Sequence, residues 1–370
     1  MALPTLTPGC HADHPEVTAA APIDRITPAS DTTGLPPDTT PPPPDTTPLP
    51  PDTTPLPPPP SDFATCADLP GDSVGATPRT LLALLRQAQP GQKIWMADGT
   101  YSSKTWSDRH GTEEQPIVLC GSRGAVIAGD LRAQNLSHWV FAGFRSQGAF
   151  QGIYLQNVDH SRLVNLQISG VKKEAIHFLC GSARNVVERD TITDTGNSTP
   201  SYHGEGVYIG SNAGKGPTGS ICAGQIDQSD SNIVQHVHFG PDVPSEDVQV
   251  RQSTRGNIIR YNTSDGTGKS VVAGQYQASL SADNGSYDAQ FIGNRMVPGA
   301  QQCGIPGCTT YGYGIYIYGG SGHLVDSNFV DVTGAGSGGY GIRVSGSGTV
   351  CKASNTVVNG KRSNVACLTP

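Results

Sequence analysis

Apolar side chains recur at every second position in a set of short segments spread over residues 153–344. Each segment has two apolar residues separated by one other residue, and Gly, Asn, Asp or Ser soon follows. The segments are Ile153–Leu155, Ile176–Phe178, Val207–Ile209, Val248–Val250, Ala278–Leu280, Ile315–Ile317 and Ile342–Val344. Alternation that ends in turn residues predicts short β-strands with one buried face.

A second apolar strand follows in several of these units, at 163–168, 186–192, 258–264 and 324–330. Successive first strands begin 23 to 41 residues apart. Repeated units of this kind stack as the coils of a parallel β-solenoid, each about 4.8 Å above the last. A β-propeller would need antiparallel hairpins and a more regular spacing. The sequence therefore predicts an all-β solenoid.

Three regions of the chain differ in composition. Residues 1–30 are polar and irregular, residues 31–60 repeat a Pro/Thr heptad such as DTTPLPP, and residues 61–370 carry the strand pattern. Proline fixes φ and removes the amide donor, so the heptads predict an extended polyproline II segment rather than a coiled coil. They would act as a stiff stalk in front of one β-domain.

One short helix is predicted at 78–88, just before the strand pattern begins. Thr77 supplies an N-cap and Pro78 suits the first helical position. This helix would cap the N-terminal end of the solenoid, where unpaired strand edges would otherwise aggregate.

The acidic charge of the chain is concentrated at its beginning. The net charge is −7, and residues 1–60 hold seven acids and one base, which leaves the remainder near −1. A body without a positive field does not favour nucleic acid as a partner. The sequence contains no apolar stretch of about 18 residues, so no membrane span is expected.

Cysteines and glycosylation motifs indicate an oxidising, extracellular location. The chain has nine cysteines, and the pairs that we expect are Cys66–Cys120, Cys180–Cys222, Cys303–Cys308 and Cys351–Cys367. Sequons occur at Asn135, Asn197, Asn262 and Asn284, and the heptads offer Thr39, Thr40, Thr46, Thr47, Thr53 and Thr54 for O-glycosylation. The sequence therefore predicts a secreted glycoprotein.

A polar position recurs in the second strand of the units. It is held by Asp190, Asn262 and Asn328, with Asn165, Asn294 and Asn355 close to it. Side-chain amides that stack from coil to coil can bond to one another. An inward Asn cannot carry a glycan, so this ladder conflicts with the sequon at Asn262.

The middle residue of each first strand should point out of the solenoid, because its apolar neighbours point in. These residues are Tyr154, His177, Tyr208, Gln249, Ser279, Tyr316 and Arg343, and a second outward row contains Gln156, Arg251 and Tyr318. Rings and amides along one face suit sugars. The predicted carbohydrate-binding residues are Tyr154, His177, Tyr208, Gln249, Arg251, Tyr316 and Tyr318; an ordinary solvated sheet face is the alternative.

Carboxyl groups lie beside the centre of the row, at Glu205, Glu246 and Asp247. Carboxylates near a neutralising cation, with a base above them, could remove a proton beside a uronate carboxyl group. The alternative is that these acids are turn residues that cap strand ends.

The stretches 82–121, 190–196, 204–211 and 246–268 are similar to right-handed parallel β-helix polysaccharide lyases of the chondroitinase B and alginate lyase type. The resemblance implies a single right-handed parallel β-helix over residues 61–370. It also implies a polysaccharide as the partner.

The resemblance further implies an Asp-x-Lys-Glu strand, and this chain instead has Gln249, Arg251 and Gln252. Arg251 would then be the catalytic base if the protein is a lyase, as in pectate lyases of the same architecture. The resemblance also implies Ca²⁺, here on Glu205, Glu246 and Asp247. The missing carboxylates weaken such a site, and Arg holds its proton more tightly than Lys.

Two functions follow from these observations. The first is a secreted, non-catalytic glycoprotein that binds a polysaccharide or builds a wall, matrix or filament with copies of itself. The second is an active lyase that cleaves an acidic glycan by β-elimination. The substituted strand and the Pro/Thr segment favour the first, and the prevalence of lyases among similar sequences favours the second.

Overall fold

The computed structural model describes residues 66–197, 204–266, 277–283, 285–297, 312–332 and 340–359. The expected irregular segment 1–30, the polyproline II segment 31–60 and the six heptad threonines lie outside these residues. The division of the chain at residues 30 and 60 therefore stays a prediction.

The described strands form three parallel sheets, which we name A, B and C. Sheet A contains, in spatial order, β1 (Asp72–Ala76), β2 (Gln92–Met96), β5 (Ile117–Gly121), β8 (Trp139–Ala142), β11 (Arg162–Val164), β14 (Val186–Glu188), β17 (Ile233–Gln235), β20 (Ile258–Arg260), β23 (Gln290–Ile292), β26 (Leu324–Asp326) and β29 (Val350–Cys351). Sheet B contains β3 (Gly99–Tyr101), β6 (Ala125–Ala128), β9 (Arg145–Gln147), β12 (Gln167–Ser169), β15 (Thr191–Ile192), β18 (His238–Phe239), β21 (Thr263–Ser264), β24 (Arg295–Met296), β27 (Phe329–Asp331) and β30 (Thr356–Val358). Sheet C contains β4 (Lys104–His110), β7 (Leu131–Ser137), β10 (Ile153–Asp159), β13 (Ile176–Leu179), β16 (Val207–Ile209), β19 (Val248–Val250), β22 (Gln277–Ala282), β25 (Gly312–Ile317) and β28 (Tyr340–Val344).

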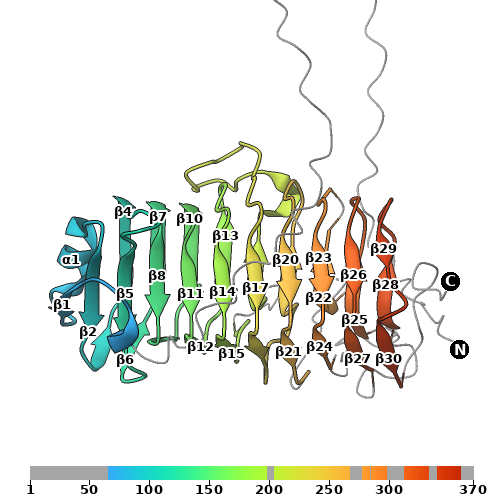
Figure 1. Ribbon diagram of the computed structural model, residues 1–370, viewed down its shortest axis with the longest axis horizontal. Coiled ribbons are helices and arrows are strands. Elements are labelled where there is room, and N and C mark those ends of the chain that lie inside the picture. The colour runs from blue at the N-terminus through green and yellow to red at the C-terminus, as the bar shows by residue number, and fades with distance from the viewer. Residues whose placement is uncertain are drawn as a thin grey trace, which may run out of the picture. The chain divides into compact units, whose positions relative to one another are not determined.

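From β4 onward the chain visits the sheets in a fixed cycle, C then A then B. Each coil adds one strand to each sheet, and every strand pairs in parallel with its equivalent in the next coil. Figure 1 shows the coils side by side, from β1 and α1 in blue to β29 and β30 in red. This is a parallel β-helix, consistent with the right-handed form, and the all-β prediction is confirmed.

Each predicted second strand is in fact two strands in different sheets. The segment 163–168 divides between β11 and β12, and 258–264 divides between β20 and β21. The break falls at Asn165 and Tyr261, which have φ of 53° and 56°. A left-handed backbone turns the chain out of the strand direction, which makes the coil three-sided.

The first strands bury their apolar residues in one core, as predicted. Ile153, Leu155, Val207, Ile209 and Val250 are all completely buried and belong to the same cluster, as do their equivalents in the other coils. The parallel register places like residues above one another, so each apolar position becomes a continuous column.

The predicted helix is present as α1 (Leu81–Gln87) and is shorter than 78–88. Its N-cap is Thr80 rather than Thr77, although the Thr77 carbonyl accepts the first helical N–H, from Leu81, at 3.0 Å. Leu81 and Leu85 are buried in the core. A capping role for α1 stays a prediction. Among the described residues, no helix is both long and apolar enough to cross a membrane.

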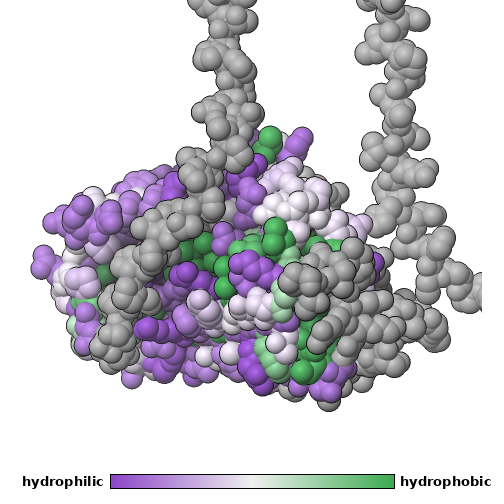
Figure 2. All heavy atoms as spheres, turned by 45° about the vertical axis from the view of Figure 1, so that its right-hand side comes forward, coloured by the Kyte–Doolittle hydropathy of each residue, from purple (hydrophilic) through white to green (hydrophobic). Residues whose placement is uncertain are grey.

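Sheet A also carries apolar residues on its outer face. The side chains of Val140, Val186, Ile233, Ile258 and Leu324 are half-buried there, in equivalent positions of their strands. Figure 2 shows hydrophobic side chains among hydrophilic ones on the face that it draws. Parallel strands with two apolar faces read as nearly continuous hydrophobic runs, which explains the short IVL, WVF and IIR sequences.

An asparagine ladder runs through four coils. The side-chain amide of Asn262 donates to Asn294 at 3.0 Å, Asn294 to Asn328 at 2.9 Å, and Asn328 to Asn355 at 2.9 Å. Each of these acceptor oxygens also receives a backbone N–H from the coil below. Asn165 is not part of the ladder, because it lies in the turn and accepts a bond from Arg123.

The burial of Asn262 corrects one predicted glycosylation site. Asn262 is completely buried inside the ladder, so no glycan can be attached there. Asn197 is exposed and Asn135 is half-buried, while Asn284 lies outside the described residues. A second ladder, of Asn185, Asn232 and Asn257, was not predicted.

Two of the expected disulfides are present, Cys66–Cys120 and Cys180–Cys222. Cys351 is also disulfide-bonded, and Cys303, Cys308 and Cys367 lie outside the described residues. Cys66–Cys120 ties the start of the described chain to β5, and Cys180–Cys222 ties the β16–β17 connection to the end of β13.

We predict that Asn294→Ala lowers the free energy of unfolding by about 2–4 kcal/mol, because the backbone N–H and the amide of Asn262 both lose their buried acceptor. Denaturant unfolding followed by circular dichroism measures this change. Asn197→Ala, which alters an exposed amide, is the control and should change the free energy by less than about 0.5 kcal/mol. Equal effects of the two substitutions would contradict the prediction.

Candidate functional site

The outer face of sheet C carries the row that the sequence assigned to carbohydrate binding. Strand pairing aligns Tyr154, His177, Tyr208, Gln249, Ser281, Tyr316 and Arg343 in successive coils. The prediction had placed Ser279 in this row, which is wrong by two residues, because Leu280 and not Ala278 pairs with Val248. Leu280 is the larger apolar side chain, and its burial in the core column is the more favourable.

The row is packed rather than open to solvent, contrary to the expectation of a ligand-facing surface. Tyr154, His177 and Tyr208 are each only 8% exposed. The ring of His177 meets Tyr154 at 5.1 Å and Tyr208 at 4.7 Å, both edge to face. Rings on neighbouring coils are close enough to pack in this favourable geometry, so they cover one another.

The connection between β16 and β17 covers one end of the row, which the sequence did not reveal. The backbone N–H of Ile221 in this connection donates to the Gln156 side chain at 2.9 Å. Cys222, held by its disulfide to Cys180, packs in a buried cluster with Tyr154. The connection is yellow-green in Figure 1. The connection thus covers the Tyr154 end of the row, whereas Arg251 lies beside Tyr208, further along it.

Arg251 is held by three neighbours at the centre of this face. Its guanidinium lies 2.5 Å from Asp283, donates to Asn212, and stands over the ring of Tyr208 at 5.4 Å from the ring centre. The Arg251 side chain is 14% exposed and that of Asp283 is 17% exposed. The ion pair is therefore fixed in place but still reachable from solvent.

The surroundings keep Arg251 protonated. Burial acts to lower its pKa, but Tyr208, Asp283 and Glu246 together outweigh burial, and the pKa of Arg251 is raised. A general base must be deprotonated when it acts. The raised pKa of Arg251 therefore works against the role of a general base.

Three glutamates form a buried column beside the row. Glu174, Glu205 and Glu246 are each at most 4% exposed. Backbone bonds place them in successive coils, because Ala175 donates to the Glu205 carbonyl and Gly206 to the Glu246 carbonyl. Glu174 is not among the site residues expected from the sequence. The available signal was position, since each glutamate lies two residues before a first strand.

Burial changes the protonation of this column. Burial, then the charges of Glu174 and Glu246, raise the pKa of Glu205 to about 8. Burial also raises the pKa of Glu246 to about 7, against a bond from the Ser245 hydroxyl. For Glu174 burial acts in the same direction, but His177 and Gln151 outweigh it and the pKa is lowered. Near pH 7 Glu205 is therefore mostly protonated, Glu246 is about half protonated and Glu174 is ionised.

The expected metal site at Glu205, Glu246 and Asp247 is not supported. Within the part of the chain that the structure describes, no three His, Cys, Asp or Glu side chains form a group that could hold a metal ion. The geometry of the described residues thus lends no support to Ca²⁺ on Glu205, Glu246 and Asp247, which stays an expectation from the sequence.

His177 has one nitrogen without a partner. Its Nε2 donates to the Gly210 carbonyl at 3.0 Å, so Nδ1 of the neutral ring carries the lone pair. Nδ1 is buried and makes no hydrogen bond. Burial lowers the pKa of His177 despite the opposing charge of Glu174. A neutral imidazole with a free lone pair is thus placed between Tyr154 and Tyr208.

The remaining predicted sugar-binding residues form a separate aromatic group. Tyr316 is 4% exposed and stacks on Tyr313 at 4.8 Å, with Arg343 over both rings. Tyr318 is 45% exposed and meets the edge of Tyr316. Gln249 and Ser281 separate this group from Tyr208 along the row. The predicted residues are therefore not one continuous aromatic surface.

Comparison with known proteins identifies the architecture. No family model and no curated protein matches the chain. Among solved structures, alginate lyase from Paenibacillus sp. str. FPU-7 is similar with a TM-score of 0.64 and 23% identity, over 80% of this chain and 99% of that one. Pectate lyase Pel9A is similar with a TM-score of 0.52 and 12% identity, over 80% of each chain. The chain has the parallel β-helix fold of these lyases. The resemblance seen in the sequence is confirmed at the level of the fold.

We predict that the β-helix loses stability as pH rises from about 4.5 to about 8, in part through Glu205. A carboxyl group whose pKa is raised in the folded state binds more protons there than in the unfolded chain, so its contribution to stability falls as pH rises through this window. Glu205→Gln should therefore gain stability relative to the wild type as pH rises, by a few kcal/mol in all.

Denaturant unfolding of both proteins across this pH range measures the difference. Burial also lowers the pKa of His177, which opposes the trend at acidic pH, but it is common to both proteins. Glu113→Gln, at an exposed glutamate, is the control and should parallel the wild type. A constant difference between Glu205→Gln and the wild type at all pH values would refute the prediction.

Proposed function

We propose that the protein binds a polysaccharide at the outer face of sheet C, around Arg251, and does not cleave it. The observation that carries this proposal is the state of Arg251, which is clamped by Asp283 and Asn212 over Tyr208. A preformed guanidinium with a partly exposed edge binds hydroxyl and carboxylate groups without ordering a flexible side chain.

The same observation disfavours β-elimination through Arg251, because its ion pair holds the proton that a base would have to lose. Tyr208 and Tyr154 are also poorly suited to act as the base in place of Arg251. Burial raises the pKa of Tyr208 well above its ordinary value and that of Tyr154 to about 12. Both phenols are therefore neutral near pH 7, and neither replaces Arg251 as a base.

The location and wider role follow from the rest of the chain. Disulfides persist in oxidising environments, and Cys66–Cys120 and Cys180–Cys222 fit a secreted protein. The Pro/Thr segment 31–60 would act as a stiff stalk in front of the β-helix. In this proposal the protein is a polysaccharide-binding or structural component of a wall, matrix or filament, in which copies of the chain could associate.

A second candidate function is an active lyase on an acidic glycan. The observation that favours it is His177, whose Nδ1 has a lone pair and no partner. Because Nδ1 is buried between Tyr154 and Tyr208, one of these rings would have to turn aside before a sugar could reach it. His177 would then take the proton beside the uronate carboxyl, and Arg251 would neutralise that carboxyl. The C–O bond to the neighbouring sugar would break as the C=C bond of the unsaturated product forms, and the neutral Tyr208 phenol would protonate the departing oxygen.

We predict that the full chain binds an alginate, pectate or chondroitin oligosaccharide in calorimetry without forming an unsaturated product, with or without Ca²⁺. Arg251→Ala should weaken binding by about 1–2 kcal/mol, which is roughly a 5- to 30-fold rise in Kd. Arg251→Lys should recover part of it, because the charge remains but the two-point contact does not.

Arg255→Ala is a matched control. Arg255 also pairs with an aspartate, Asp288 at 2.9 Å, and stands over Tyr287, but its side chain is 63% exposed and it lies outside the row. It should bind like the wild type. Steady release of unsaturated product by the wild type, lost in His177→Gln, would replace this proposal with the lyase. A triple variant carries Gln249→Asp, Arg251→Lys and Gln252→Glu. If this variant forms unsaturated product and the wild type does not, the result would support descent from an enzyme.

A further inference from the structure

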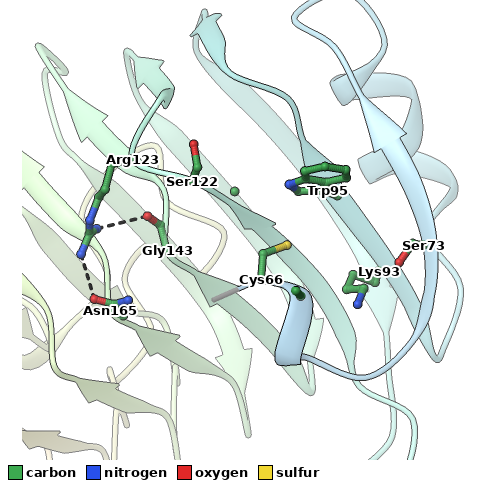
Figure 3. A pocket seen from close by; sticks show the side chains of 10 residues that line it. Cys66, Ser73, Lys93, Trp95, Ser122, Arg123, Gly143 and Asn165 are labelled. Carbon is green, nitrogen blue, oxygen red and sulfur yellow. Dashed lines mark hydrogen bonds between the residues drawn. The ribbon is translucent and has the colours of Figure 1, made fainter. Parts of the chain in front are cut away.

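A cavity of about 650 Å³ lies on the outer side of sheet A, between its first strands and the segment that begins at Cys66. Figure 3 shows Trp95 and Lys93 from β2 on one side and Ser122, Arg123 and Asn165 on the other, with Cys66 between them. No residue of the sheet C row contributes to it. The function proposed above leaves this cavity unexplained.

Trp95 provides an open aromatic surface in this cavity. Its neighbours in β2, Ile94 and Met96, are completely buried, so strand alternation turns Trp95 outward, where it is 54% exposed. In the adjacent strand β1 the paired residue is Gly75, and a Cβ placed there would have no neighbour within 4 Å. Among the residues that the structure describes, the β1 strand therefore places no side chain beside the indole ring at this position.

On its other side, Trp95 lies next to a disulfide-linked segment. Its partner in β5 is Cys120, which is bonded to Cys66. Cys66 begins the short 3-10 helix η1 (Cys66–Asp68), and Ala67 of this helix also lines the cavity. An exposed tryptophan beside a rigid wall is a platform for a flat, partly apolar ring.

The charged groups in the cavity are both positive. The guanidinium of Arg123 donates to the Asn165 side chain at 2.8 Å and to the Gly143 carbonyl at 3.2 Å, which fixes it across neighbouring coils. The Lys93 ammonium donates to the Leu69 carbonyl at 2.7 Å, and this bond uses one of its three donors. No Asp or Glu is among the residues that line the cavity.

We propose that this cavity binds a uronic acid residue of a polysaccharide, with the sugar ring on Trp95 and its carboxylate toward Arg123 and Lys93. Charge complementarity selects the anionic sugar over a neutral one, since both charged side chains that line the cavity are positive and the nearby Asp190, which offsets part of the Arg123 charge, does not line it. The arrangement contrasts with sheet C, where Glu174, Glu205 and Glu246 lie beside the row. The two faces would contact different parts of one chain or two different chains.

Tryptophan fluorescence tests this proposal in the full chain. The protein has three tryptophans, and Trp106 and Trp139 are 2% and 0% exposed. Acrylamide quenching therefore reports mainly on Trp95. We expect a hexagalacturonate probe to lower the quenching constant at least about twofold, because a stacked sugar shields the ring. Cellohexaose, a neutral probe of the same length, should leave the constant unchanged.

Two variants separate the contributions of the ring and the charge. Arg123→Gln should raise the concentration of hexagalacturonate that gives half-protection by at least about tenfold, through the loss of a charged contact. Trp95→Ala should remove the corresponding binding step in calorimetry. Phe150→Ala, at another exposed aromatic residue that is 48% exposed, is the control for the loss of a surface ring. Unchanged thermal unfolding confirms that each variant is folded.

The outcomes also distinguish this site from the one on sheet C. Arg251→Ala should leave the protection of Trp95 unchanged, and Trp95→Ala should leave the Arg251-dependent binding unchanged. Equal protection by cellohexaose would overturn the anionic specificity. Failure of hexagalacturonate to protect Trp95, or a Trp95 that is already inaccessible to acrylamide in the free protein, would overturn the site itself.

Discussion

The parallel register between coils is the constraint on which the rest of this protein depends. Each residue lies directly over its equivalent in the next coil, about 4.8 Å away. Apolar residues such as Ile153, Ile176 and Val207 therefore become a column of core. Polar residues become ladders, as at Asn294 and Asn328. Most long-range contacts of this β-helix are between stacked coils, so the stacking contributes strongly to its stability.

The same constraint produces the chemistry of sheet C. Stacking places three glutamates at one position of successive coils, and burial together with their mutual repulsion raises the pKa of Glu205 to about 8. It also places Tyr154, His177 and Tyr208 edge to face. Repetition at one position therefore matters, because three polar residues stacked in a column change one another's charge and exposure, whereas a single one would not.

The fold tolerates changes in sequence that the function does not, for a physical reason. The β-helix is set by many repeated contacts and survives large changes in sequence, as its likeness to two polysaccharide lyases at 23% and 12% identity shows. Activity depends instead on the proton state of a few side chains. At Arg251 that state depends on burial and on the charges of Tyr208 and Asp283, which lie in other coils.

The sequence by itself determined the first strands, the parallel stacking and the buried columns, because alternation and turn residues act locally and repeat. It also led to the row containing Tyr208, the Asn262 ladder and two disulfides. It did not show that each second strand bends into two sheets. Only the tertiary structure decided which outward residues stay exposed. The packing of Tyr154, the cover over Gln156 and the opening around Trp95 each depend on contacts between segments far apart in the chain. Distances of that kind leave no periodic trace in the sequence, so burial, protonation and the cavity had to be read from the fold.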